Sequence, residues 1–123
     1  MKLVINKELL KDRGIVYVLE ITLDTGTVVK IGMTNRTKVE ERVVEILTEM
    51  YKRYRYFPRC YVARFTTVDN PLDMEQKLHE CFKEYSVEME YSFGGSTEFF
   101  KVDVDLVKEK YDEMVKDRKR DKD

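Results

Sequence analysis

The sequence GIVYVLEIT, residues 14–22, decides the fold, because β-branched and aromatic residues dominate it. Residues 28–33 (VVKIGM) have the same character. The short segment DTGT, residues 24–27, separates the two runs and contains a glycine. Two β-prone runs around such a segment predict a β-hairpin.

The register of this hairpin decides which side chains become neighbours. A two-residue turn at residues 25–26 predicts that Tyr17 lies opposite Thr34 and that Ile21 lies opposite Lys30. Any register in which the paired residue numbers have an odd sum gives the same distribution of side chains between the two faces. The face assignment is therefore more secure than the pairing itself.

One face of the hairpin is predicted to be polar. Side chains alternate along a strand, so Tyr17, Lys30, Gly32 and Thr34 project from the same side, and the opposite side is apolar throughout. We expect the apolar face to pack on helices. The polar face combines a phenol, an amine and a hydroxyl with a bare glycine that a ligand backbone could approach closely. The alternative is a solvated sheet face with Tyr17 lying across it.

The rest of the chain alternates between helix and strand patterns. Apolar residues at helical spacing predict helices over residues 39–53, from Pro71 to near residue 86, and from Val104 to about residue 115. Strand patterns occupy residues 60–67 and 97–102. We therefore predict an α/β (α+β) fold: a small three- to four-stranded, mostly antiparallel sheet flanked by three helices, in the order ββαβαβα.

Length and composition limit the classes of protein to consider. A chain of 123 residues that is 42% hydrophobic fits one compact domain. We expect an N-terminal extension over residues 1–13, a single domain over residues 14–115 and a charged tail over residues 116–123. No apolar run approaches the ~20 residues of a membrane span, and residues 1–6 lack the apolar stretch of a signal peptide. We expect no membrane association and a cytoplasmic, intracellular location, inside the host cell if the protein is viral.

The net charge of −1 conceals a basic segment. Residues 51–64 contain basic side chains, no acidic one, and interleaved tyrosine and phenylalanine. Basic groups neutralise phosphates and aromatic rings stack on bases, so Lys52, Arg53 and Arg55 are candidates for binding a nucleic-acid substrate. The alternative is that the aromatic residues enter the core and the basic residues solvate the outer face.

Four short stretches, in a fixed order, resemble the active site of a GIY-YIG nuclease. They are the sequences VYVL at residues 16–19, KIGMT at residues 30–34, Arg42, and STEFF at residues 96–100 with Glu98 at its centre. The chain resembles the phage-type branch of this superfamily, whose second motif commonly reads Lys-Ile-Gly. The resemblance extends from Gly14 to about residue 102, which is most of the chain.

Individual residues match the family pattern with two departures. Tyr17 corresponds to the first-motif tyrosine, Arg42 to the helix arginine, Glu75 and His79 to a Glu-x-x-x-His helix, and Glu98 to the catalytic glutamate before an aromatic pair. The first motif has one extra residue between its glycine and its tyrosine. The interval from the second motif to Arg42 is about one residue longer than is usual in this branch.

The resemblance implies a chemistry for each of these residues. Glu98 would bind a single Mg²⁺ or Mn²⁺ ion, most of whose other ligands would be water and phosphate oxygens. Tyr17 would orient or deprotonate the attacking water, and Lys30 would lower the pKa of this phenol, which is ordinarily ~10. Arg42 would pair with the phosphate, and Gly32 would leave room for the substrate backbone.

Further residues have two interpretations each. Thr34 and Arg36 could contact phosphate, or could be surface residues that cap the start of the next helix. His79 could shuttle protons or bind phosphate in the active site. It could also be an i, i+4 partner of Glu75 on the second helix. We favour the supporting role for Glu75 and His79.

The function that these residues predict is metal-dependent endonucleolytic hydrolysis of DNA by a one-metal mechanism. One alternative is a non-catalytic nucleic-acid-binding module, and another is a protein-binding factor in a conflict between a virus and its host. We expect no separate recognition domain, in which case specificity would come from a homodimer, a partner protein, or DNA structure such as branches and nicks.

Overall fold

The order of helices and strands is the one that the sequence predicts. The computed structural model describes residues 13–89 and 98–121. Its elements are β1 (Arg13–Leu23), β2 (Gly26–Thr34), α1 (Val39–Tyr54), β3 (Arg59–Asp69), α2 (Pro71–Cys81), a 3₁₀ turn (Lys83–Tyr85), β4 (Phe99–Phe100) and α3 (Val104–Asp121). This arrangement confirms the α+β class and the order ββαβαβα.

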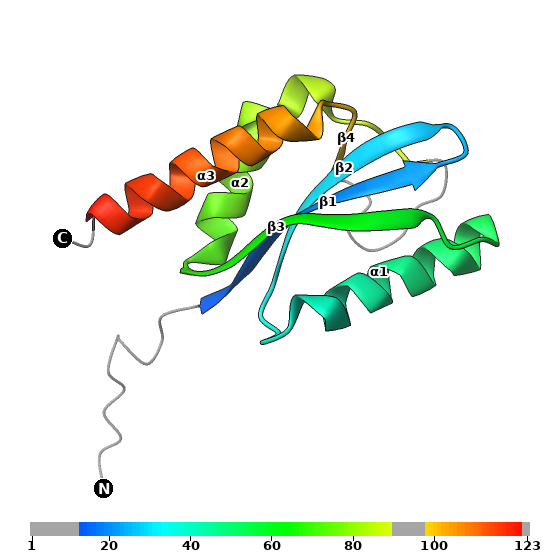
Figure 1. Cartoon of the computed structure of the whole chain (residues 1–123), viewed down its shortest axis with the longest axis horizontal. Coiled ribbons are helices and arrows are strands. Elements are labelled where there is room, and N and C mark those ends of the chain that lie inside the picture. The colour runs from blue at the N-terminus through cyan, green and yellow to red at the C-terminus, as the bar shows by residue number, and fades with distance from the viewer. Residues whose placement is uncertain (1–12, 90–97, 122–123) are drawn as a thin grey trace, which may run out of the picture.

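The four strands form one antiparallel sheet in the spatial order β3-β1-β2-β4. Helix α1 lies against one face of the sheet, and α2 and α3 lie together against the other (Figure 1). The hairpin of β1 and β2 is therefore central, with β3 and β4 at the two edges. The polar residues of the hairpin therefore lie on strands that have a neighbouring strand on each side: β1 lies between β3 and β2, and β2 lies between β1 and the short strand β4.

The hairpin register differs from the predicted one by two residues. Tyr17 pairs with Gly32, and Leu23 pairs with Gly26, so the turn falls at residues 24–25 and not at 25–26. Gly26 adopts a φ of 132°, which side chains rarely tolerate, and it closes the turn from the first position of β2. The sum of paired residue numbers stays odd, so the predicted division of side chains between the faces is confirmed.

Both faces of the sheet are buried, which corrects the expectation of one open polar face. Val16, Val18 and Ile31 pack with α2 and α3 in one core. Tyr17 and Leu19 pack with residues of α1 in a second core on the other face. The polar face of the hairpin therefore forms one side of the core under α1, because this helix supplies enough apolar surface to cover it.

A β-bulge interrupts the pairing of the edge strand β3 with β1. Val18 pairs with Arg64 and Leu19 pairs with Val62, so Ala63 is the extra residue. A bulge shifts the alternation of side chains by one position. Two residues of β3 that are an even number of positions apart therefore point to opposite faces of the sheet when Ala63 lies between them.

Two local expectations are wrong. The last strand contains only Phe99 and Phe100, where residues 97–102 were expected, and residue 97 lies outside the described residues. Helix α3 continues to Asp121, so residues 116–121 are helical and do not form a tail. Arg118 anchors this last part of the helix by donating to the Asp69 carbonyl oxygen at 2.7 Å.

The predicted N-terminal extension falls mostly on residues 1–12, which lie outside the described part of the chain.

Asn70 begins α2 in a left-handed conformation and, within the described residues, makes no side-chain capping bond. Across residues 13–89 and 98–121, no helix combines the length and the apolar character that crossing a membrane requires.

Candidate active site

The site is organised by an ion pair between the central hairpin and the start of β4. The Lys30 ammonium on β2 donates to the Oε2 atom of Glu98, which directly precedes β4. Lys30 is fully buried, whereas the Glu98 side chain is 22% exposed. The Lys30 nitrogen also lies 5.2 Å from the centre of the Phe99 ring. The pair therefore joins a buried ammonium to a carboxylate that reaches solvent.

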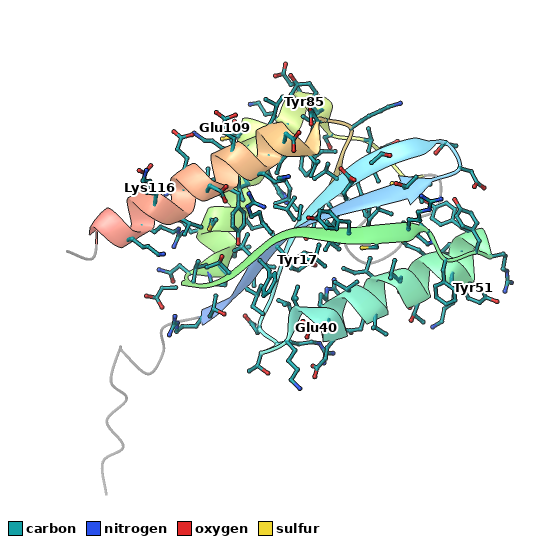
Figure 2. All side chains as sticks on the ribbon, viewed as in Figure 1. Tyr17, Glu40, Tyr51, Tyr85, Glu109 and Lys116 are labelled. Carbon is teal, nitrogen blue, oxygen red and sulfur yellow. The ribbon has the colours of Figure 1, made fainter. Side chains whose placement is uncertain are left out.

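Tyr17 and Arg42 meet on the same face of the sheet. Tyr17 is fully buried on β1, and the half-buried Arg42 reaches it from the first turns of α1. The Nε atom of Arg42 donates to the Tyr17 hydroxyl oxygen at 3.4 Å. In Figure 2, Tyr17 lies between the sheet and the Glu40 end of α1. The structure thus brings Arg42 to the tyrosine although its spacing from the second motif is unusual.

Gly32 accommodates the ring of Tyr17. A Cβ atom added at Gly32 would lie 2.7 Å from the Tyr17 Cζ atom and 3.0 Å from its Cε2 atom. The tyrosine leans across β2 and fills the space above the glycine. This corrects the expectation that Gly32 leaves room for a substrate backbone, because the space is already occupied by a side chain of the chain itself.

The electrostatics of Tyr17 also differ from expectation. Burial raises its pKa to about 12, and the hydrogen bond and positive charge of Arg42 oppose that rise. The sequence predicted Lys30 in the role of lowering this pKa. Lys30 instead pairs with Glu98, and burial lowers the pKa of Lys30 itself. The cation whose effect on the phenol is resolved is therefore Arg42, and the predicted role of Lys30 stays a prediction.

Glu75 and His79 lie one helical turn apart on α2, and both reach the backbone of β2. His79 Nε2 lies 2.8 Å from the Ile31 carbonyl oxygen, and Glu75 accepts a hydrogen bond from the Met33 backbone N–H. The short strand β4 pairs only with Val29 and Lys30. The helix therefore satisfies backbone groups of β2 beyond the end of β4.

This arrangement gives the Glu-x-x-x-His spacing a structural purpose that the sequence did not reveal. Two residues at positions i and i+4 project from the same side of a helix. They can therefore contact backbone groups two residues apart on a strand, because every second residue directs its backbone N–H and C=O toward the same edge. The predicted supporting role of both residues fits this geometry. Direct pairing of Glu75 with His79 was the expectation, and contact with the strand edge is the observation.

The Glu75 carboxyl is buried and only partly hydrogen-bonded. It is 6% exposed, and its Oε2 atom has no hydrogen-bond partner among the described residues. Burial raises its pKa to about 7, the negative charge of Glu98 adds to this rise, and Lys30 and the Met33 N–H oppose it. Glu75, Glu98 and Lys30 thus form one electrostatically coupled group around the start of β4.

Thr34 and Arg36 hold the connection between β2 and α1. Thr34 is buried, and its hydroxyl accepts a hydrogen bond from the Arg36 backbone N–H at 3.2 Å. The exposed guanidinium of Arg36 pairs with Glu45 at 2.8 Å and with Glu41 at 3.4 Å. These contacts fit the interpretation of both residues as local structure at the helix start better than that of phosphate ligands.

The basic residues Lys52, Arg53 and Arg55 are not part of this cluster. They are exposed and follow shortly after Tyr51, which Figure 2 shows at the opposite end of α1 from Glu40. The rise of an α-helix puts about 16 Å between Arg42 and Arg53. Tyr51 and Phe57 stack there with ring centres 4.5 Å apart. The segment is a separate, basic and aromatic surface.

The carboxylates suit a metal that takes few protein ligands. Within residues 13–89 and 98–121, no group of three or more histidine, cysteine, aspartate or glutamate side chains could hold a metal ion. Mg²⁺ usually keeps several waters and takes one or two carboxylates. The partly exposed Glu98, with the unsatisfied oxygen of Glu75 in the same electrostatic group, fits that pattern.

The fold and the site together define a small α+β domain with a charge-paired polar centre on its sheet. The chain matches the T5orf172 domain over residues 14–115, and it belongs to that family. This is a phage-associated domain of a nuclease-like or DNA-binding type. Searches of curated proteins and of solved structures return no match for the chain.

Changing Gly32 to alanine tests the contact with Tyr17. We expect Gly32→Ala to lower the free energy of unfolding by about 1–3 kcal/mol, because the new methyl group overpacks the ring. The cost should shrink to a few tenths of a kcal/mol in a Tyr17→Val background, where no ring lies above residue 32. Urea unfolding of the four proteins measures both costs, and an equal cost in both backgrounds would contradict the assigned role of Gly32.

The raised pKa of Glu75 predicts a pH dependence of stability. The folded state holds the Glu75 proton up to about pH 7, whereas the unfolded chain releases it near the ordinary value of 4.5, so stability falls as pH rises through this interval. The shift corresponds to at most about 3.5 kcal/mol, at about 1.4 kcal/mol per pKa unit.

Urea unfolding without metal, from pH 4.5 to 8, measures this slope. Glu75→Gln should remove that part of the decline, and Glu109→Gln on the exposed face of α3 should retain it. Identical pH profiles for the wild type and Glu75→Gln would refute the shift.

Proposed function

We propose that the protein is a GIY-YIG-type endonuclease that hydrolyses phosphodiester bonds of DNA with Mg²⁺ or Mn²⁺. The observation that supports this most is the convergence of Tyr17, Lys30, Arg42 and Glu98 from four different parts of the chain. Arg42 contacts Tyr17, Lys30 contacts Glu98, and Tyr17 lies within the electrostatic influence of Glu98.

Glu98 is the residue that would hold the metal, and Glu75, whose charge interacts with that of Glu98, could supply a second carboxylate oxygen. The bound ion would stabilise negative charge on the phosphate and the leaving oxygen. Because Lys30 already pairs with Glu98, the lysine fixes the orientation of this carboxylate before any ion arrives. It also adds a positive charge beside the position of the substrate phosphate.

Arg42 would bind the scissile phosphate. Its Nε atom is committed to the Tyr17 hydroxyl, and its terminal nitrogens can donate in parallel to two phosphate oxygens. A guanidinium suits this task better than an ammonium, because one planar group serves the tyrosine and the phosphate together.

Tyr17 would act as a neutral phenol. A pKa of about 12 leaves it protonated at neutral pH, so it accepts a hydrogen bond from Arg42 and retains its own proton for donation. This favours the orientation of the attacking water over its deprotonation. In this respect the proposal is narrower than the expectation from the sequence.

A second candidate function is binding of nucleic acid without cleavage. The surface of Lys52, Arg53 and Arg55 with the stacked Tyr51–Phe57 pair favours it, because it lies away from the catalytic cluster and could bind DNA alone. In an endonuclease the same surface would extend the contact along the DNA. Specificity would then come from DNA structure, from a homodimer or from a partner protein.

An endonuclease assay with Mg²⁺ or Mn²⁺ on branched, nicked and linear DNA tests the proposal. We expect metal-dependent cleavage by the wild type, and a loss of at least about 100-fold in rate for Glu98→Gln and for Arg42→Lys, since removing one electrostatic contact to the reacting centre costs that much. Glu109→Gln should cleave normally.

Thermal unfolding would verify that each variant is folded at the assay temperature. Equal metal-dependent cleavage by the wild type and Glu98→Gln would refute the mechanism. The absence of cleavage by any of the proteins, with DNA binding that weakens steeply with salt, would favour the binding module.

A further inference from the structure

The edge strand β3 presents two exposed aromatic side chains on opposite faces of the sheet. Tyr61 is 60% exposed and Phe65 is 56% exposed. Residues four apart on a regular strand share a face, but the bulge at Ala63 lies between these two. Tyr61 therefore pairs with Glu20 on the α2–α3 face, and Phe65 pairs with Tyr17 on the α1 face.

Phe65 lies beside the catalytic tyrosine and outside the cover of α1. Directly paired residues of neighbouring strands have Cβ atoms about 4.5–5.5 Å apart and point to the same side. On this face of β3, Cys60 and Val62 are partly buried against the α1 core, whereas Phe65 is exposed. The helix therefore covers the strand up to the bulge and leaves the phenyl group next to Tyr17 open to solvent.

The direction in which the Tyr17 ring leans leaves the surface around Phe65 uncovered. Its ring crosses toward Gly32 on β2, away from β3. The site then has a definite order across the sheet, from Phe65 on the edge, through Tyr17 with Arg42, to Lys30 and Glu98. A phosphate between Arg42 and Glu98 would place the adjoining nucleotide within reach of Phe65, one strand spacing of about 5 Å from Tyr17.

An exposed phenyl group selects for a particular state of a nucleotide. It offers no hydrogen bond, so it cannot read a base edge in a groove. It binds a base through its flat face, as exposed aromatic residues on other nucleic-acid-binding sheets do. In a continuous duplex both faces of every base are covered by neighbouring bases. A free base face exists where the stack ends, as at a flap, a branch or a single strand.

We propose that Phe65 is a stacking platform for an unpaired base next to the scissile phosphate, and that the substrate class is DNA with unpaired nucleotides at the cleavage position. This inference rests on the proposed function. It adds a preference for unpaired over duplex DNA, which the catalytic residues do not supply. The bulge at Ala63 is the device that turns Phe65 to the catalytic face.

DNA binding measured without metal tests the proposal separately from catalysis. Fluorescence anisotropy in EDTA would compare a single-stranded oligonucleotide, a flap and a blunt duplex for the wild type, Phe65→Ala, Phe65→Tyr and Tyr61→Ala. We expect Phe65→Ala to weaken binding to the single strand and to the flap by about 5- to 150-fold, the range for loss of one stacked base, and to leave duplex binding unchanged.

Two variants serve as controls. Phe65→Tyr keeps an aromatic face and should restore binding to near the wild-type value. Tyr61→Ala removes an equally exposed ring of the same strand from the opposite face and should bind as the wild type does. A 2-aminopurine base placed beside the cleavage position reports stacking directly, and its fluorescence should fall on binding the wild type but not on binding Phe65→Ala.

Three results would overturn the proposal. They are equal single-strand binding by the wild type and Phe65→Ala, equal losses on single strand and duplex, and a Phe65-dependent dimer in sedimentation that makes the β3 edge a surface for a second copy. Cleavage with Phe65-independent binding would refute only this inference. Phe65-dependent binding by a protein that cleaves nothing would refute the endonuclease and leave the stacking role intact.

Discussion

The contact between Lys30 and Glu98 is the constraint on which the site depends. A fully buried ammonium is costly to remove from water, and a carboxylate in contact with it offsets much of that cost. The pair also ties the middle of β2 to the residue before β4. Because Glu98 is the partner that reaches solvent, the same contact that stabilises the charge also presents the carboxylate to the metal and the phosphate of the proposed mechanism.

The rest of the domain supports this contact from three directions. Helix α1 covers the face that carries Lys30 and delivers Arg42 to Tyr17. Helix α2 satisfies the edge of β2 through Glu75 and His79, so β4 can remain two residues long. The unsatisfied oxygen of Glu75 and its raised pKa are the consequence of burying a carboxyl so close to Glu98. A strand longer than β4 would satisfy the same edge without placing a second carboxyl there.

The sequence predicted the composition of the site better than its internal contacts. Strand alternation correctly placed Tyr17, Lys30 and Gly32 on one face, because this grouping survives a register shift of two residues. The resemblance supplied Arg42 and Glu98. The partner of Lys30 could not be read from the sequence, because Glu98 is 68 residues away and its position depends on how β4 pairs with β2.

Other errors have similar physical causes. The role of Gly32 depends on the direction in which the Tyr17 ring leans, which packing decides and periodicity does not. The position of Phe65 depends on the bulge at Ala63, and alternation alone would have placed it with Tyr61. The charged end of the chain looked like a tail because its apolar pattern ends near residue 115. Arg118 extends the helix through polar contacts with Asp69 and Asp73.

A double-mutant cycle on the free energy of unfolding, with Lys30→Met, Glu98→Gln and the double variant in metal-free buffer, tests the central contact most directly. If the pair organises the site, the effects of the two substitutions are coupled by at least about 1 kcal/mol, as expected for groups in direct contact. The double variant would then be more stable than the sum of the single effects implies. Effects that add to within about 0.5 kcal/mol would show that Lys30 and Glu98 stabilise the fold independently, and would contradict this account.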